Sequence, residues 1–196
     1  MSELDRIKWQ QRYREDSYRK NNPVTLVADW LPKMPPGKAL DVACGAGRNA
    51  IFLAAAGYRV DAIDISAEGL KKAGQSAAEQ GVEVNWIEHD FDRPFEFDGD
   101  YDVILVMWYV NLELVTRLCD CLAPGGFLVC EEHLITAEDV IGPSSDDFRV
   151  APGALRGAVA GLELLLYEES IEIGEEDGER VASARVVARN GLPEKG

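Results

Sequence analysis

Short apolar runs recur along the chain, and each is bounded by glycine, proline or an acidic residue. They are rich in valine, isoleucine and leucine, and their length suits strands better than buried helices. A near-continuous apolar run of this kind is typical of a strand that is buried on both faces. We therefore predict five strands, over Lys38–Ala43, Tyr58–Ile63, Val82–Ile87, Tyr101–Met107 and Phe127–Glu131.

Between these runs lie segments whose apolar residues have helical spacing. In one of them Ser66 is a good N-cap and Gly81 a good stop signal. The predicted helices cover Arg48–Ala56, Ala67–Gln80 and Asn111–Leu122, with further helices over Pro23–Leu31 and Pro152–Val159. Strands and helices that alternate in this rhythm predict βαβ units and a parallel sheet covered on both faces.

The last part of the chain departs from this alternation. Leu162–Ile173 and Arg180–Ala188 are two β-like runs joined by the acidic, glycine-containing turn Gly174–Glu179. Such a pair predicts a hairpin that gives the sheet an antiparallel edge. The predicted fold is therefore α/β and doubly wound, with a mostly parallel seven-stranded sheet, helices on both faces and a C-terminal antiparallel hairpin. We expect one domain over residues 1–196, with 1–22 as an N-terminal helix or lid and 132–151 as a substrate-capping loop.

Composition and charge narrow the classes of partner. A length of 196 residues suits one domain, and a net charge of −15 disfavours nucleic acid, which is bound through clustered Lys and Arg. No run approaches the ~20 apolar residues of a membrane span, and the charged N-terminus has no apolar signal segment. We therefore expect a cytoplasmic protein. The four cysteines, Cys44, Cys119, Cys121 and Cys130, lack metal-ligand spacing, so we expect free thiols and no metal.

The segment Ala39–Asn49 runs from a strand through a glycine turn directly into a helix. Gly45 and Gly47 allow a sharp turn and a close approach of the backbone to a ligand, with the helix N-terminus beside it. This signal is weak by itself. It also fits the G-x-G-x-x-A fingerprint of nicotinamide and flavin enzymes, and a tight turn without a ligand has the same pattern.

Three acidic residues at strand ends separate these alternatives. A pyrophosphate beside Asp41 would be repelled, whereas a cationic amino group would be attracted. Asp64 ends the second strand about 20 residues past the glycines, where an acid can accept both ribose hydroxyls. Asp90 follows the third strand, where a carboxylate can accept an adenine amine. Open α/β sheets bind ligands at the carboxyl ends of their strands, so the three acids together indicate one ligand site.

With these residues in place, the chain resembles class I S-adenosylmethionine-dependent methyltransferases. The likeness is strongest to the small tellurite-resistance and thiopurine-type branch. Its core is carried by Leu40–Asn49, Asp64, His89-Asp90 and Leu122-Ala123-Pro124-Gly125-Gly126. Further similarity lies in Trp9-x-x-Arg12-Tyr13 and in Pro152-Gly153-Ala154-Leu155 leading to Tyr167-Glu168-Glu169.

The resemblance implies S-adenosylmethionine as the cofactor. It implies that Asp41 and the glycine loop contact the methionyl part, that Asp64 holds the ribose, and that Asp90 binds the adenine amine. Two departures stand out: the family usually has glycine at Ala43, and glutamate at Ala154. The predicted cofactor-binding residues are Asp41, Ala43, Cys44, Gly45, Ala46, Gly47, Asn49, Asp64, Ile65, Asp90, Phe91, Met107 and Trp108.

The acceptor would lie at the ends of the fourth and fifth strands, where Trp108–Asn111 and Glu131–His133 reach the same rim. His133 is the candidate general base, and its alternative is a loop or capping role. Candidate substrate contacts are Tyr13, Tyr109 and Glu132. Trp9, Tyr13 and Tyr18 form either a lid over the site or an aromatic stripe that docks the N-terminal helix.

The predicted function is methyl transfer from S-adenosylmethionine to a small-molecule acceptor by in-line displacement. In such a reaction the cofactor supplies the reactivity, and the protein aligns the acceptor and excludes water. Two alternatives remain: a catalytically silent S-adenosylmethionine-binding regulator or subunit, and an NAD(P)-dependent oxidoreductase. We expect no membrane partner and either a monomer or a homodimer. The pattern leaves a thiol, an oxyanion, an amine and a carboxylate all open as acceptors.

Overall fold

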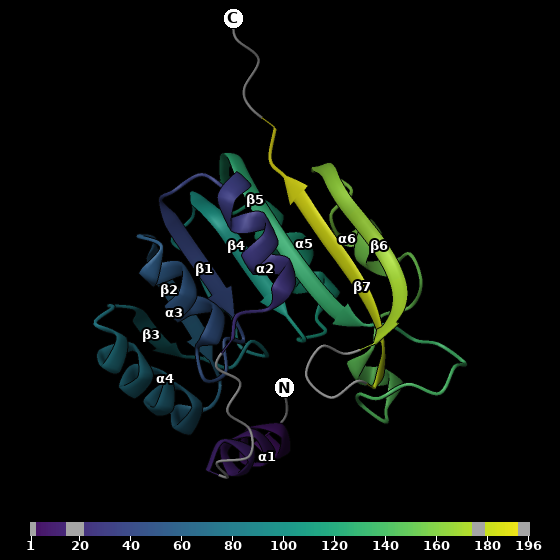
Figure 1. Cartoon of the computed structure of the whole chain (residues 1–196), viewed down its shortest axis with the longest axis horizontal. Coiled ribbons are helices and arrows are strands. Elements are labelled where there is room, and N and C mark those ends of the chain that lie inside the picture. Colours follow the sequence, from purple (N-terminus) through teal and green to yellow (C-terminus); the bar gives the residue numbers. More distant parts are fainter. Residues whose placement is uncertain (1–2, 15–21, 174–178, 192–196) are drawn as a thin grey trace, which may run out of the picture.

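A computed structural model describes residues 3–14, 22–173 and 179–191. Within this part of the chain, seven strands form one sheet in the order β3-β2-β1-β4-β5-β7-β6 (Figure 1). The strands are β1 (Lys38–Val42), β2 (Arg59–Asp64), β3 (Asn85–Glu88), β4 (Tyr101–Met107), β5 (Leu122–His133), β6 (Glu163–Ile173) and β7 (Arg180–Arg189). β7 runs antiparallel to both of its neighbours, and the other pairs are parallel. The predicted doubly wound sheet with its antiparallel hairpin is confirmed.

Helices cover both faces of the sheet (Figure 1). They are α1 (Glu3–Arg14), α2 (Thr25–Trp30), α3 (Arg48–Ala55), α4 (Ala67–Gln80), α5 (Leu112–Cys119) and α6 (Ala154–Ala158), with 3₁₀ turns η2 (Leu31–Lys33) and η3 (Asp146–Phe148). The side chain of Ser66 caps α4 by accepting from the Gly69 amide, and Gly81 ends that helix in the left-handed conformation. Both signals act as the sequence predicts.

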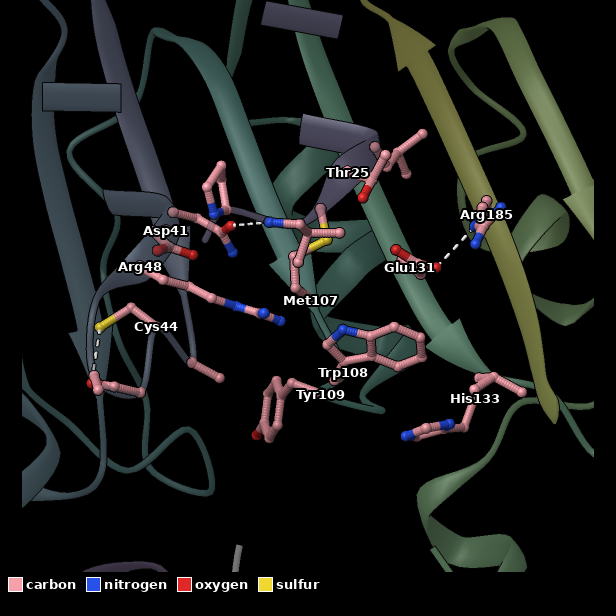
Figure 2. A pocket seen from close by; sticks show the side chains of 18 of the residues that line it. Thr25, Asp41, Cys44, Arg48, Met107, Trp108, Tyr109, Glu131, His133 and Arg185 are labelled. Carbon is pink, nitrogen blue, oxygen red and sulfur yellow. Dashed lines mark hydrogen bonds and ion pairs between the residues drawn. The ribbon is translucent and has the colours of Figure 1, made fainter. Parts of the chain in front are cut away.

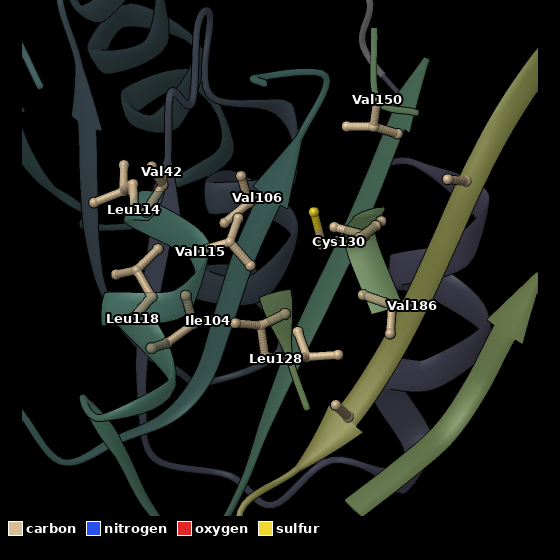
Figure 3. Packing of buried hydrophobic residues seen from close by; sticks show 14 of the residues in the cluster. Val42, Ile104, Val106, Leu114, Val115, Leu118, Leu128, Cys130, Val150 and Val186 are labelled. Carbon is tan, nitrogen blue, oxygen red and sulfur yellow. The ribbon is translucent and has the colours of Figure 1, made fainter. Parts of the chain in front are cut away.

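Each face of the sheet has its own hydrophobic core. On one face α2, α3 and α4 pack through residues such as Val27, Leu53 and Leu70. On the other face, α5 and α6 pack against alternate residues of β4, β5 and β7 (Figure 3). Leu118 of α5 and Leu155 of α6 belong to this core, as does Leu128 of β5. Because side chains alternate across a strand, neighbouring residues of β5 enter different cores. This alternation decides which side chains of β5 point to each face of the sheet.

The start of the fifth strand and the end of the helix before it differ from the prediction, because β5 is longer than expected. The fifth strand begins at Leu122, before the Pro124-Gly125-Gly126 turn, and Leu122 pairs with Tyr101. The predicted helix Asn111–Leu122 therefore ends at Cys119. The reason is the ladder with β4, which continues through a register shift between Tyr101 and Val103. The turn Gly174–Glu179 falls mostly outside the described residues.

β1 and β4 lie side by side at the point where the order of strands reverses. A crevice forms at the carboxyl ends of the strands at such a switch point, because the connections leave toward opposite faces. Helix α1 lies beyond these carboxyl ends and contacts α4 (Figure 1). No described helix is both long and apolar enough to cross a membrane.

Candidate functional site

A cavity of about 560 Å³ opens at these carboxyl ends (Figure 2). One part, which we call the glycine-loop half, is formed by Asp41 of β1, by residues 43–46, 48 and 49 of the loop and helix that follow, and by Asp64 and Ile65 at the end of β2. The other, the β5 half, is formed by the ends of β4, β5 and β7. Helix α2 and side chains of α1 and β6 complete the walls.

The glycine loop has the conformation that its sequence requires. Gly45 and Gly47 have φ of 58° and 80°, in the left-handed region that favours glycine. A Cβ on Gly45 would lie 2.2 Å from the Tyr13 hydroxyl, and one on Gly47 would lie 2.6 Å from the Trp86 ring. Tyr13 thus covers the loop from α1, and Trp86 supports it from β3. A larger residue at Gly45 would displace Tyr13 from the wall of the site, and one at Gly47 would displace the ring that supports the loop.

Ala43 also has a positive φ, of 54°. This is the position at which the resembling family usually has glycine. An L-residue with a side chain costs roughly 1–2 kcal/mol in this conformation, because its Cβ approaches the carbonyl oxygen. Alanine in place of the family's usual glycine therefore introduces a small conformational strain at residue 43.

Asp64 is buried at the end of β2 and organises the loop opposite. Its Oδ2 accepts the Gly45 amide at 2.8 Å, and its Oδ1 accepts the Ser66 amide at 2.8 Å. Burial raises the pKa of Asp64, and these backbone donors act in the opposite direction. One carboxylate thereby joins the loop after β1 to the start of α4.

Asp41 is fully buried at the end of β1 and lines the same cavity. Neither of its carboxylate oxygens has a hydrogen-bond partner of ordinary geometry among the described residues. Burial raises its pKa from 3.8 to about 7, although the Ala50 amide and the charge of Arg48 oppose the shift. A buried carboxylate without a partner is costly, so the site fits a ligand that brings a cation or a donor to Asp41.

The β5 half contains an ion-paired cluster. Arg185 Nε donates to Glu131 Oε1 at 2.7 Å, across the register pair that joins β7 to β5 (Figure 2). Its Nη1 lies 2.8 Å from Glu172 Oε2 and 3.9 Å from Glu168 Oε2. Three carboxylates therefore surround one guanidinium, and the cluster carries an excess of negative charge.

Trp108 and His133 lie on the rim of the cavity, with Trp108 between the two halves and His133 at the end of β5 (Figure 2). Their ring centroids lie 4.4 Å apart. Trp108 has a φ of 61°, which is an outlier for a bulky residue and costs of order 1–3 kcal/mol. Such strain is found where the surroundings impose it, and it is frequent at functional sites.

Most of the predicted site residues meet in this cavity. Its walls include the predicted residues Tyr13, Asp41, Ala43, Cys44, Gly45, Ala46, Asn49, Asp64, Ile65, Met107, Trp108, Tyr109 and His133. Trp9 also lines it, whereas the predicted lid residue Tyr18 lies outside the described residues. From the predicted capping loop, His133 and Ile141 reach the cavity.

Gly47, Asp90 and Phe91 do not line the cavity. Gly47 acts through packing at the start of α3. The Asp90 carboxylate accepts the Asp92 amide at 3.1 Å, and Phe91 lies 5.9 Å, between ring centroids, from Tyr109. The two residues are thus next to the wall that Tyr109 forms. The role of Asp90 at an adenine amine stays a prediction.

Glu132 does not line the cavity either, which corrects its assignment as a substrate contact. Glu131 and Glu132 are adjacent in β5, so their side chains leave opposite faces of the sheet. Glu131 reaches the cavity, and Glu132 lies beside Cys130 in the core under α5. Its Oε1 accepts the Tyr109 amide at 3.0 Å.

Sequence reasoning placed Glu131 on the rim but missed Arg48 and Arg185 as cavity residues. Arg48 stands inside the glycine motif, so its position was a usable signal. Glu131 and Arg185 are brought together only by the pairing of β5 with β7, which the predicted hairpin did not specify. Helix α2 adds Thr25 and Asp29, which no motif marks.

Part of the chain matches a known family. Residues 39–126 match the family model described as a methyltransferase domain. The sheet order and the similar solved structures show a Rossmann-like methyltransferase fold. Solved structures with a similar fold include one described as a SAM-dependent methyltransferase from Methanosarcina mazei.

Among particular proteins, the chain is similar to TehB from Haemophilus influenzae, with a TM-score of 0.73 at 21% identity over 94% of this chain and 66% of that one. It is also similar to a magnesium protoporphyrin IX methyltransferase from Synechocystis, solved with bound SAH, with a TM-score of 0.70 at 14% identity over 96% and 98%. An uncharacterized methyltransferase of Schizosaccharomyces pombe is 39% identical over 66 residues, which are 34% of this chain and 46% of that protein. The chain spans about half the length or less of the curated relatives that it matches.

Proposed function

We propose that this protein transfers a methyl group from S-adenosylmethionine to a small-molecule acceptor. The observation that carries the proposal is Asp41, which lines the cavity beside the glycine loop. It is a fully buried carboxylate whose oxygens have no hydrogen-bond partner of ordinary geometry among the described residues. The ammonium group of the cofactor's methionyl part has the charge and the donors that this carboxylate needs. A pyrophosphate, as in NAD, would be repelled there.

The other residues of the glycine-loop half fit the rest of the cofactor. Asp64 has lone pairs left for ribose hydroxyls after its two backbone bonds. The guanidinium of Arg48 reaches the same cavity and suits the methionyl carboxylate. When bound, S-adenosylmethionine supplies an electrophilic methyl group. The protein's share is to orient the two reactants and to exclude water, and Tyr13 over the loop serves that exclusion.

Charge in the β5 half bears on the acceptor. Arg185 is already paired with Glu131 and Glu172, so little of its positive charge is left for an anionic substrate. With Glu168 the cluster is net negative. We therefore expect a neutral or cationic acceptor, such as an amine or a thiol, to be preferred over an inorganic oxyanion.

His133 is the candidate general base for an acceptor that must lose a proton. Its stacking on Trp108 supports a second role, in which the ring holds the rim of the site. We further propose that the protein acts in the cytoplasm, as a monomer or homodimer, and not on nucleic acid; the net charge of −15 supports the last point.

Calorimetry tests the proposed cofactor. We expect S-adenosylmethionine and S-adenosylhomocysteine both to bind and to raise the melting temperature, and NAD and NADP to do neither. Tight NAD binding without S-adenosylhomocysteine binding would overturn the proposal in favour of an oxidoreductase.

An acceptor panel then separates an enzyme from a silent binding protein. Release of S-adenosylhomocysteine is measured with small amines, thiols, carboxylates and oxyanions such as tellurite. We expect turnover with an amine or a thiol and none with tellurite. Cofactor binding without turnover on any member would favour the silent regulator or subunit.

A further inference from the structure

The loop after β4 adopts a conformation that its own sequence does not favour. Trp108 has a φ of 61°, and neither Trp108 nor Tyr109 is a residue that enters the left-handed region readily. Asn111 caps α5 by accepting the Leu114 amide at 2.9 Å, which fixes the far end of the loop but not Trp108. Something outside the loop must therefore hold this residue in place.

Three successive residues at the end of β5 do so. The carbonyl oxygen of Glu131 accepts the Trp108 amide at 2.8 Å. The Glu132 carboxyl group accepts the Tyr109 amide at 3.0 Å, and the His133 ring lies 4.4 Å from the Trp108 ring, measured between centroids. The first is a backbone interaction that any residue at 131 could make. The hydrogen bond from the Tyr109 amide to Glu132 requires a side-chain acceptor of this length at position 132.

Burial of the Glu132 carboxyl group in the core of the sheet is energetically unfavourable. It is 1% exposed, and its Oε2 has no hydrogen-bond partner in the described part of the chain. Burial raises its pKa well above the usual range. Its neighbours on that face, Leu128 and Cys130, are core residues, and an apolar side chain at 132 would fit the same environment. The clear gain from Glu132 is the bond to Tyr109.

We propose that Glu132 is a positioning residue that acts from the far face of the sheet. By holding the Tyr109 amide, it keeps Trp108 in the left-handed conformation and the indole on the rim between the glycine-loop half and the β5 half. Glu132 itself touches neither ligand. The functional part of this inference rests on the proposed function, because it takes the cavity to be the cofactor site.

The test compares Glu132→Gln with Glu132→Leu. Glutamine keeps a neutral oxygen acceptor of the same length, and leucine removes it. In protein labelled with 5-fluorotryptophan, the Trp108 signal is assigned by its loss in Trp108→Phe. We expect Glu132→Leu to shift that signal and to leave the Trp86 signal in place, and Glu132→Gln to shift neither. We expect the affinity for S-adenosylhomocysteine to fall about tenfold in Glu132→Leu and to stay within about twofold in Glu132→Gln.

Leu128→Ala is the matched control, because Leu128 is buried on the same strand and the same face without a bond to the loop. It should lower the melting temperature and leave the Trp108 signal unchanged. In a Trp108→Gly background, Glu132→Leu should cause no further loss of affinity, because the strained ring is gone. An unchanged Trp108 signal in Glu132→Leu, or equal damage from Glu132→Gln, would overturn the inference. The fluorine signal is read without ligand, so a protein that binds no S-adenosylhomocysteine would refute the proposed function and not this geometry.

Discussion

The two halves of the cavity are built in different ways. In the glycine-loop half, Asp41, the loop and Asp64 lie within one βαβ unit, and backbone amides make the decisive hydrogen bonds. In the β5 half, Glu131 and Arg185 are 54 residues apart, and side-chain charges and rings form the walls. A local motif thus shapes the first half, and the tertiary pairing of β5 with β7 shapes the second. We expect the first to decide which cofactor binds and the second to decide which acceptor is used.

The largest expected effect is that of Asp64→Ala on cofactor affinity. The substitution removes the proposed ribose acceptor and also releases the Gly45 and Ser66 amides. Hydrogen bonds to charged groups contribute roughly 1.5–3 kcal/mol each, so the loss of two bonds to the ribose hydroxyls predicts a fall of about 100-fold or more in affinity for S-adenosylmethionine. Calorimetry measures it. Glu131→Gln, which alters only the β5 half, is the control and should bind the cofactor nearly as well as wild type. Unchanged affinity in Asp64→Ala would remove Asp64 from the cofactor site.

Asp41→Asn should lower the affinity for S-adenosylmethionine about tenfold, because a charged acceptor for the ammonium group is lost. In wild type, affinity should rise with pH toward 7 as Asp41 ionises, since burial raises its pKa to about 7. The asparagine variant should lose this pH dependence. Titrations at pH 5.5 and 8 test both points, and an equally pH-dependent variant would assign the effect to another group.

The same substitution should have the opposite effect on the unliganded fold. With a folded pKa of about 7 and an ordinary value of 3.8, Asp41 binds its proton more tightly in the native state. The stability it contributes is complete below about pH 4 and is lost as pH rises to 7. Asp41→Asn should therefore raise the melting temperature at pH 8 more than at pH 4. A lower melting temperature at pH 8 would show that the carboxylate has a partner in the folded protein.

His133→Phe should change turnover by less than about threefold, because phenylalanine keeps the ring against Trp108 and removes the nitrogens that could transfer a proton. His133→Ala should reduce turnover further, since it removes that ring contact. If His133 is a general base, both variants should lose roughly 10²–10⁴-fold, and the rate should rise with pH in wild type alone. Turnover and pH profiles on an acceptor from the panel distinguish the two roles.

The smallest expected effect is that of Ala43→Gly. Ala43 has a φ of 54°, so glycine removes the side-chain strain, and its own entropy cost leaves a net gain of about 0.5–1 kcal/mol. For a chain of this size the melting temperature should rise by about 1–4 °C. Ala46→Gly is the control, because Ala46 does not have a positive φ, and it should not stabilise. A melting temperature that rises equally in both would show that strain at Ala43 is not the cause.

The sequence predicted the sheet and the glycine-loop half well, because both depend on short-range patterns. The apolar runs marked the strands, and Ser66 and Gly81 marked a helix to the residue. Glu132 shows the limit of such reasoning. Its place on the rim could be predicted from the chain, but the face of the sheet that it enters depends on the exact register of β5. The Glu131–Arg185 pair and the strain at Trp108 depend on contacts between strands that are far apart in the sequence, so no local pattern predicts them.

The position of β7 bears on how the molecule is made. β7 lies between β5 and β6 in the sheet, yet it follows both in the chain. During synthesis from the N-terminus, β5 keeps an open edge while residues 134–179 emerge, and an open strand edge can pair with a neighbouring chain. Only the arrival of Arg180–Arg189 closes that edge and brings Arg185 to Glu131. The β5 half is therefore completed last, and a nascent chain that already has its glycine loop still lacks the wall facing the acceptor.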